Sequence, residues 1–160
     1  MTQLTLDFGP PPAPDLDNFV PGRNAECLAA LRTLLARLDA GEVPEPRVIY
    51  IWGPAGSGKS HLAGALAAHG ARRLCVVDDC DRLDPAAQER LFHAFNRLVQ
   101  SPADALVAFA AVPPARLTLL PDLVSRLGWG IVLGLAPLGD EELDDVLLAE
   151  PVAAAHGVVE

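Results

Sequence analysis

The sequence predicts an α/β domain in which a mostly parallel sheet of about four strands lies between two layers of helices. Short runs of consecutive apolar residues, such as RVIYIW at 47–52, are typical of strands that are buried on both faces. Segments with apolar residues at helical spacing alternate with these runs along the chain. Because alternating strands and helices build parallel sheets covered on both faces, these two observations indicate a three-layer α/β/α fold.

Boundary signals define the individual elements. The first helix is expected between Asn24 and Gly41, with Asn24 as its N-cap and Gly41 as its stop. Asp84 and Pro85 are the N-cap and first position of a later helix that runs to about residue 100. The other predicted elements are buried strands over 47–52, 74–78, 105–111 and 131–135 and helices over 62–68, 121–127 and 140–150.

Composition limits the classes of function. The chain has 160 residues, 51% of them apolar, and a formal net charge of −9. This charge argues against a broad surface for nucleic-acid phosphates, so we expect any contact with DNA to be indirect. Cys27, Cys75 and Cys80 show no CxxC spacing, and neither a secretory signal nor an apolar run of membrane-spanning length is visible. We therefore expect a cytoplasmic protein with reduced thiols and no membrane partner.

The segment GPAGSGKS at 53–60 is the strongest functional signal. It fits G-x-x-x-x-G-K-[ST] in full between a predicted strand and a predicted helix, and Lys59 is the only lysine of the chain. In such a P-loop, backbone N–H groups converge on phosphate oxygens, the lysine reaches the β and γ phosphates, and the final Ser binds Mg²⁺. The alternative is a glycine-rich turn that fits the pattern by chance. The predicted nucleotide contacts of this segment are Gly53, Pro54, Ala55, Gly56, Ser57, Gly58, Lys59, Ser60 and His61, although His61 also fits a residue that caps or packs the helix.

Two aspartates stand at the carboxyl end of the strand predicted over 74–78, and they predict where Mg²⁺ and the attacking water bind. Asp78 is expected to hold Mg²⁺ together with Ser60, and Asp79 is expected to orient attacking water. A pair of carboxylates at an exposed strand end is the alternative. The strand over 105–111 ends in alanines, with no polar side chain until Arg116. We therefore expect weak intrinsic hydrolysis at most.

Several segments together resemble a known family. The entry segment LDNFVPGRN at 16–24, the P-loop, the Asp pair and SRLGWG at 125–130 resemble DnaA-like AAA+ proteins, and more closely the Hda family of regulatory inactivators of DnaA. The resemblance covers about residues 3–150. It implies that Phe19 and Val20 contact adenine, that the ligand is ADP or ATP with Mg²⁺, and that Arg126 is an arginine finger supplied in trans to a neighbouring nucleotide.

The resemblance also gives the first residues a function. Family members begin with a short peptide that docks on the DNA polymerase sliding clamp. Its pattern of one amide and alternating apolar side chains is similar to Gln3, Leu4, Leu6 and Phe8. Asp7 stands where the family often has Pro. An amino-terminal β-strand with alternating apolar residues is the alternative.

These patterns divide the chain into four parts. We expect a clamp-binding peptide at 1–8, a Pro-rich linker at 9–18, an AAA+ core at 19–138 and the start of a truncated lid at 139–160, so that the lid subdomain is largely absent. Only 17 residues separate Ser60 from Asp78, too few for a further strand and helix that the family places there.

The leading hypothesis is a regulatory AAA+ protein that docks on the sliding clamp and stimulates hydrolysis of DnaA-bound ATP. It would act as an activator more than as an enzyme, and a homo-oligomer is left open. One alternative is a self-contained P-loop ATPase, such as a helicase loader, a DNA-transport motor or a DnaA-type initiator fragment. Another is an interaction module with a vestigial P-loop.

Overall fold

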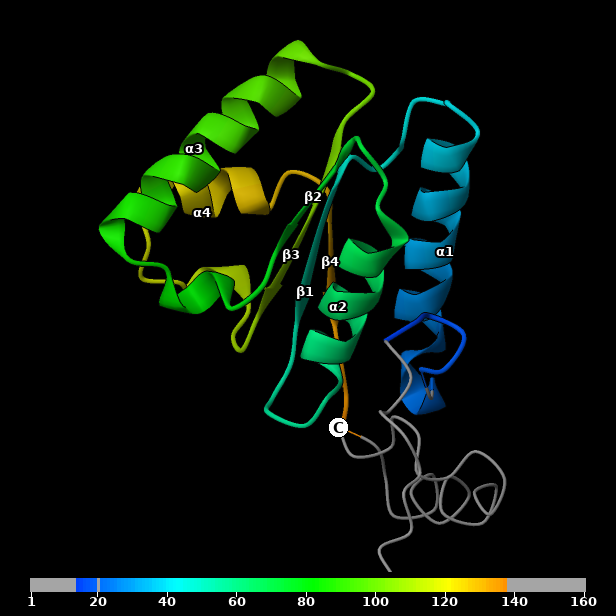
Figure 1. Ribbon diagram of the computed structural model, residues 1–160. Helices are drawn as coiled ribbons and strands as arrows, with labels where there is room; N and C mark the ends of the chain where they lie inside the picture. Colours follow the sequence, from blue (N-terminus) through cyan, green and yellow to red (C-terminus); the bar gives the residue numbers. More distant parts are fainter. Residues whose placement is uncertain (1–13, 20, 138–160) are drawn as a thin grey trace, which may run out of the picture.

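The computed structural model of the chain describes residues 14–19 and 21–137 (Figure 1). The clamp-binding peptide expected at 1–8, the contact expected from Val20 and the lid segment expected at 139–160 lie outside the described residues. The helices are α1 (Ala25–Asp39), α2 (Lys59–His69), α3 (Pro85–Gln100) and α4 (Pro121–Leu127), and the strands are β1 (Val48–Trp52), β2 (Leu74–Val77), β3 (Ala105–Ala110) and β4 (Ile131–Gly134). Short 3-10 helices are η1 (Gly22–Asn24), η2 (Cys80–Arg82) and η3 (Pro114–Arg116).

The four strands form one parallel sheet in the order β2-β3-β1-β4. The register aligns Ile49 of β1 with Val107 of β3 on one side and with Ile131 of β4 on the other. The two central strands are buried almost throughout, as continuous apolar runs predict. The prediction of four parallel strands is confirmed.

The two edge strands differ from the prediction of buried strands. Every residue of β2 is only half-buried, and β4 alternates between half-buried and exposed positions. Each of them pairs with one neighbour, β2 with β3 and β4 with β1. The apolar runs therefore predicted these strands correctly, but the prediction of full burial was wrong. An edge strand has a neighbouring strand on one side alone and is less covered.

Helices cover both faces of the sheet, which confirms the three-layer fold (Figure 1). One face of β1 carries Ile49 and Ile51, which pack with apolar side chains of α1 and α2. The other face carries Val48 and Tyr50, which pack with side chains of α3 and α4. Successive side chains of a strand point to opposite faces, so a continuous apolar strand supplies both cores.

Helix ends follow the local signals at most positions. The Asp84 carboxylate accepts a hydrogen bond from the Ala87 backbone N–H at 2.7 Å, so it caps α3 as predicted. Gly70 follows α2 with φ 71°, the left-handed conformation that glycine adopts most easily.

Asn24 does not act as the predicted N-cap. It stands at the cap position of α1, but its side chain forms no capping hydrogen bond. Instead its Nδ2 donates to the Ala136 carbonyl and its Oδ1 accepts from the Ala136 N–H, both at 2.8 Å. The residue is 4% exposed, so Asn24 provides a buried amide that ties the start of α1 to the segment after β4.

Within the described ranges, no helix has both the length and the apolar character needed to cross a membrane.

Candidate nucleotide-binding site

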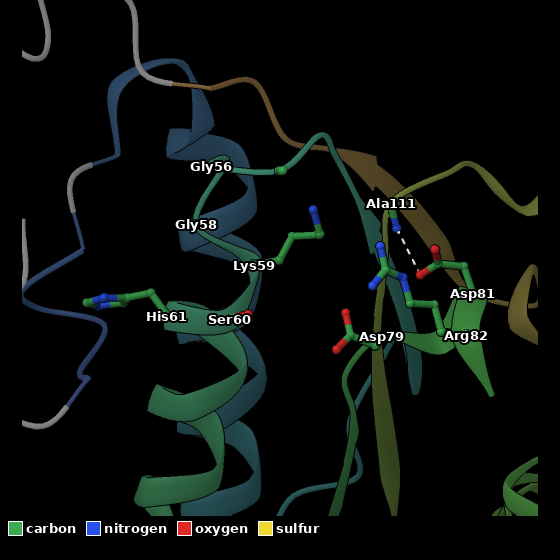
Figure 2. Close-up of a pocket in the computed structure, with 10 residues that line it drawn as sticks. Gly56, Gly58, Lys59, Ser60, His61, Asp79, Asp81, Arg82 and Ala111 are labelled. Atoms are coloured by element: carbon green, nitrogen blue, oxygen red, sulfur yellow. Dashed lines mark hydrogen bonds between the residues drawn. The ribbon is translucent and has the colours of Figure 1, made fainter. Parts of the chain in front are cut away.

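The P-loop lies at the carboxyl end of β1 and leads into α2 (Figure 2). A pocket of about 380 Å³ is formed there by P-loop residues and by residues that follow β2 and β3, and its lining comprises Ala55, Gly56, Gly58, Lys59, Ser60, His61, Asp79, Asp81, Arg82 and Ala111. In open parallel sheets, ligands bind outside the carboxyl ends of the strands. The sequence-predicted phosphate loop and Asp79 therefore meet at one pocket.

Two glycines give the loop its path. Gly56 and Gly58 have φ values of 82° and 95°, which residues other than glycine rarely adopt. At Gly58 a Cβ atom would also lie 2.6 Å from Cε2 of Phe19. Glycine is therefore required at position 58 both by its backbone conformation and by the ring packed against it.

Lys59 lies along the inside of the loop. Its Nζ donates to the carbonyl oxygens of Gly53 and Pro54, the latter at 2.9 Å. Figure 2 shows the side chain leaving the first turn of α2 with its ammonium group turned toward the loop. The ammonium is thus held at the mouth of the loop, where phosphates would enter.

Ser60 and Asp78 provide oxygen atoms of the kind that Mg²⁺ prefers. The Ser60 Oγ lies 3.4 Å from Asp78 Oδ2, and Asp78 Oδ1 accepts a hydrogen bond from the Asp79 N–H at 2.9 Å. This bond within the aspartate pair fixes the carboxylate of Asp78 toward the serine. A hydroxyl facing a carboxylate beside a phosphate loop fits a magnesium ion.

Asp79 has φ 49° and ψ 45°. Asp is among the few residues that tolerate the left-handed region, which is still uncommon outside glycine and concentrated at functional sites. In Figure 2 its carboxylate lies on the pocket wall that faces α2. The conformation turns the chain at once into η2, which places the next residues over the pocket.

Asp81 and Arg82 line the pocket and were missed by the sequence reasoning. Asp81 Oδ1 accepts a hydrogen bond from the Ala111 N–H at 3.2 Å, which joins η2 to the end of β3. Their position two and three residues after Asp79 did not identify them, because the sequence does not show that the chain turns back over the sheet there.

Phe19 and His61 lie together beside the loop. Their ring centroids are 5.6 Å apart, and His61 Nε2 lies 2.9 Å from the Asp15 carbonyl oxygen. Phe19 is 9% exposed and His61 is 5% exposed. The entry segment is thus packed onto the first turns of α2, next to the pocket.

Arg126 does not line this pocket. Its Nη1 donates to Asn96 Oδ1 at 3.0 Å, and its Cζ lies 4.4 Å from the Phe92 ring centroid and 5.6 Å from that of Trp129. The chain reaches the amino end of β1 four residues later, where a Cβ on Gly130 would overlap the Val48 carbonyl. Because β1 rises about 13 Å over its length, Arg126 belongs to the end of the sheet opposite the P-loop.

Two of the three thiols, those of Cys27 and Cys80, are buried, and that of Cys75 is half-buried. Burial raises the pKa of Cys27 and of Cys80 to about 12, with nearby acidic residues adding to the effect. Neutral, buried thiols are poor nucleophiles and metal ligands. Among the described residues, no group of His, Cys, Asp and Glu side chains could hold a metal ion by itself.

A strand, a P-loop, a helix and an aspartate pair at the carboxyl edge of a parallel sheet define the class of P-loop nucleotide-binding proteins. The AAA ATPase domain model matches residues 20–155, and the chain belongs to this family.

Solved structures show the same fold. The replication initiator DnaA bound to AMPPCP and single-stranded DNA is similar with a TM-score of 0.68 and 20% identity, over 85% of this chain and 53% of that one. Domain III of DnaA from Thermotoga maritima gives a TM-score of 0.67 and 21% identity, over 96% of this chain and 81% of that one. The RuvB Holliday junction branch migration motor of the same organism gives 0.58 and 23%, over 85% and 52%. The chain spans about half the length of the first of these proteins.

Proposed function

We propose that this AAA+ protein binds ADP or ATP with Mg²⁺ in its P-loop pocket and regulates the initiation of DNA replication. In this proposal residues 3–8 dock on the sliding clamp, and Arg126 stimulates hydrolysis of ATP bound to DnaA, as in the Hda family. The observation that carries nucleotide binding is the complete P-loop, with Lys59 and Ser60 lining one pocket and the Asp78 carboxylate 3.4 Å from the Ser60 hydroxyl.

Different residues of the chain contact different parts of the nucleotide. The P-loop amides and Lys59 neutralise phosphate oxygens, and the positive end of α2 adds to this field. Ser60 and Asp78 would hold magnesium, which when bound offsets the charge of the phosphates. Phe19, whose ring packs against Gly58 beside the pocket, is the residue we assign to an apolar contact with the adenine.

Hydrolysis within this pocket is expected to be weak. Asp79 can orient water, but β3 ends at Ala110 and is followed by Ala111, and neither side chain has a polar group for that water or for the γ-phosphate. A self-contained ATPase, such as a helicase loader or an initiator fragment, is therefore the second candidate. Many turnovers per minute by the chain alone would favour it.

Arg126 supports a function in trans. The rings of Phe92 and Trp129 and the amide of Asn96 hold its guanidinium, which still has N–H donors beyond the one used by Asn96. A guanidinium that is already oriented loses little conformational freedom when it meets a phosphate. Its distance from the chain's own P-loop is compatible with action on another subunit's nucleotide.

An exposed apolar patch near Arg126 also supports a protein partner. Trp129 is 53% exposed, and Val43 and Val99 are each 58% exposed; all three line one groove at the amino end of β1. Aromatic and apolar side chains beside an arginine are typical of the centre of a protein interface.

Hydrolysis of DnaA-bound ATP, measured with clamp and DNA present, tests the finger. We expect Arg126→Ala to lower the stimulation at least about 1000-fold, because an arginine finger contributes on this scale. Arg90→Ala, an exposed arginine on α3, is the matched control and should be as active as the parent chain. Full activity of Arg126→Ala, with an unchanged unfolding transition, would show that Arg126 is not an arginine finger.

Clamp docking is tested separately by a pull-down of the clamp with the intact chain and with Gln3→Ala/Leu4→Ala. The pattern of one amide and alternating apolar residues predicts loss of recovery in the double variant. Equal recovery would eliminate the proposed docking peptide but would leave nucleotide binding untouched.

A further inference from the structure

We propose that the guanidinium of Arg82 binds the third phosphate of the nucleotide in this pocket, so that the chain binds ATP more tightly than ADP. The inference rests on the proposed nucleotide binding and assigns to the site a residue that neither the P-loop pattern nor the aspartate pair contains.

Arg82 reaches the pocket from the wall across from the P-loop. It is the last residue of η2, and its side chain lines the same pocket as Lys59 and Asp79. Figure 2 shows its guanidinium beside Ala111, directed toward the space between Asp79 and Lys59. A phosphate that extends from the P-loop toward the end of β3 would meet this group.

The backbone beneath Arg82 is firmly anchored. Its own N–H donates to the Asp79 carbonyl at 2.9 Å, and the neighbouring Asp81 carboxylate accepts from the Ala111 N–H at 3.2 Å. Cys80, at the start of the same turn, is fully buried in the core. The base of the side chain is therefore fixed, while the exposed guanidinium can adjust to a ligand.

The charge of Arg82 is available to a ligand. Within residues 14–19 and 21–137 it forms no ion pair, although Asp79 and Asp81 line the same pocket. Lys59, the other cation that lines the pocket, is hydrogen-bonded to carbonyls of its own loop. The fork of an arginine suits the oxygens of a phosphate.

The end of β3 explains why a second cation is needed. Ala110 and Ala111 present no polar side chain where the third phosphate would lie, and two carboxylates nearby would repel it. ATP carries more negative charge than ADP, and that additional charge would lie farthest from the P-loop amides. Arg82 offsets the repulsion there, and this contribution is absent with a diphosphate.

Calorimetric titration with ADP and with the non-hydrolysable analogue AMPPNP, each with excess Mg²⁺, tests the inference. For the intact chain we expect tighter binding of AMPPNP. Arg82→Ala should weaken AMPPNP at least about tenfold, the scale of a charge-assisted hydrogen bond, and leave ADP within about twofold. Arg82→Lys should retain part of the preference, and Arg72→Ala, an exposed arginine before β2 that does not line the pocket, should retain all of it.

The outcomes separate the two proposals. If the intact chain binds both nucleotides and Arg82→Ala leaves the ratio of their affinities unchanged, Arg82 does not bind the third phosphate. The proposal of a nucleotide-binding site is then still supported. If Arg82→Ala weakens both nucleotides equally, its role is general and the inference is also overturned. If the intact chain binds neither nucleotide, the proposed function fails and this inference fails with it. Thermal unfolding of each variant shows whether a loss of binding reflects a loss of folding.

Discussion

Replacement of Asn24 by Ala tests how the start of α1 is held to the sheet. The change removes two hydrogen bonds of 2.8 Å to the backbone of Ala136. A neutral hydrogen bond contributes about 1 kcal/mol net, and a buried backbone group left without a partner costs about 1–3 kcal/mol. Ala136 is half-buried, so water can replace part of the lost bonding. We expect the free energy of unfolding to fall by about 2–3 kcal/mol.

Urea denaturation followed by circular dichroism measures this loss, and two further variants identify its cause. Ser and Asp are good N-cap residues, so Asn24→Ser and Asn24→Asp would preserve stability if Asn24 acted as a cap. A bridge to Ala136 predicts that neither variant does. The shorter Ser cannot span both groups, and an Asp carboxylate offers no N–H to the Ala136 carbonyl.

The control is Arg32→Ala, which removes an exposed ion pair with Asp17. Exposed pairs contribute little, so its unfolding free energy should stay within about 0.5 kcal/mol of the parent value. Parent-like stability of Asn24→Ser or Asn24→Asp would refute the bridge and restore the capping interpretation.

Three further predictions concern other parts of the molecule. Gly58→Ala should lower the unfolding free energy by about 2–4 kcal/mol in urea titrations, because a Cβ would lie 2.6 Å from the Phe19 ring at φ 95°, and Phe19→Leu should partly rescue it. Asp84→Ala should cost about 1 kcal/mol by the same assay through loss of the α3 cap, whereas Asp84→Ser should cost less. Because burial raises the pKa of the Cys27 and Cys80 thiols from 9.0 to about 12, the stability they confer is complete below pH 9 and is lost as pH rises toward 12. Unfolding free energies measured between pH 8 and 11 should therefore fall as the pH rises. In Cys80→Ala this fall should be shallower than in the parent chain, by up to about 1.4 kcal/mol per pH unit, because one of the two thiols is gone. A slope equal to that of the parent chain would contradict the prediction.

The fold was largely predictable because its signals are local. Continuous apolar runs marked β1 and β3, and Asp84 and Gly70 marked helix ends through backbone preferences of their own. The order β2-β3-β1-β4 was not predictable in this way, since parallel neighbours are distant in sequence. Asn24 was misassigned for a related reason. Its hydrogen-bonding partner lies 112 residues away, and no local pattern can reveal that competition.

The candidate site was predicted where chemistry and spacing coincide. The P-loop pattern identified Lys59 and Ser60, and the strand end identified Asp78 and Asp79, all of which meet at the carboxyl edge of the sheet. Arg82 could not be identified, because an arginine in a chain with eleven of them carries no signal by itself. Its distinction comes from the left-handed Asp79, which turns η2 over the pocket.

The two arginines to which we assign phosphate contacts lie near opposite ends of the sheet, and α3 connects their surroundings. α3 begins at Pro85, three residues after Arg82, and farther along carries Phe92 and Asn96, which hold Arg126. Arg82 thus faces the chain's own pocket at the carboxyl edge of the sheet, and Arg126 faces away from it near the amino end of β1. A single guanidinium could not do both, because about 13 Å of strand separates the two ends. In this assignment Arg82 binds the chain's own nucleotide and Arg126 acts on the nucleotide of a partner. These are chemically separate functions, and α3 connects the two positions.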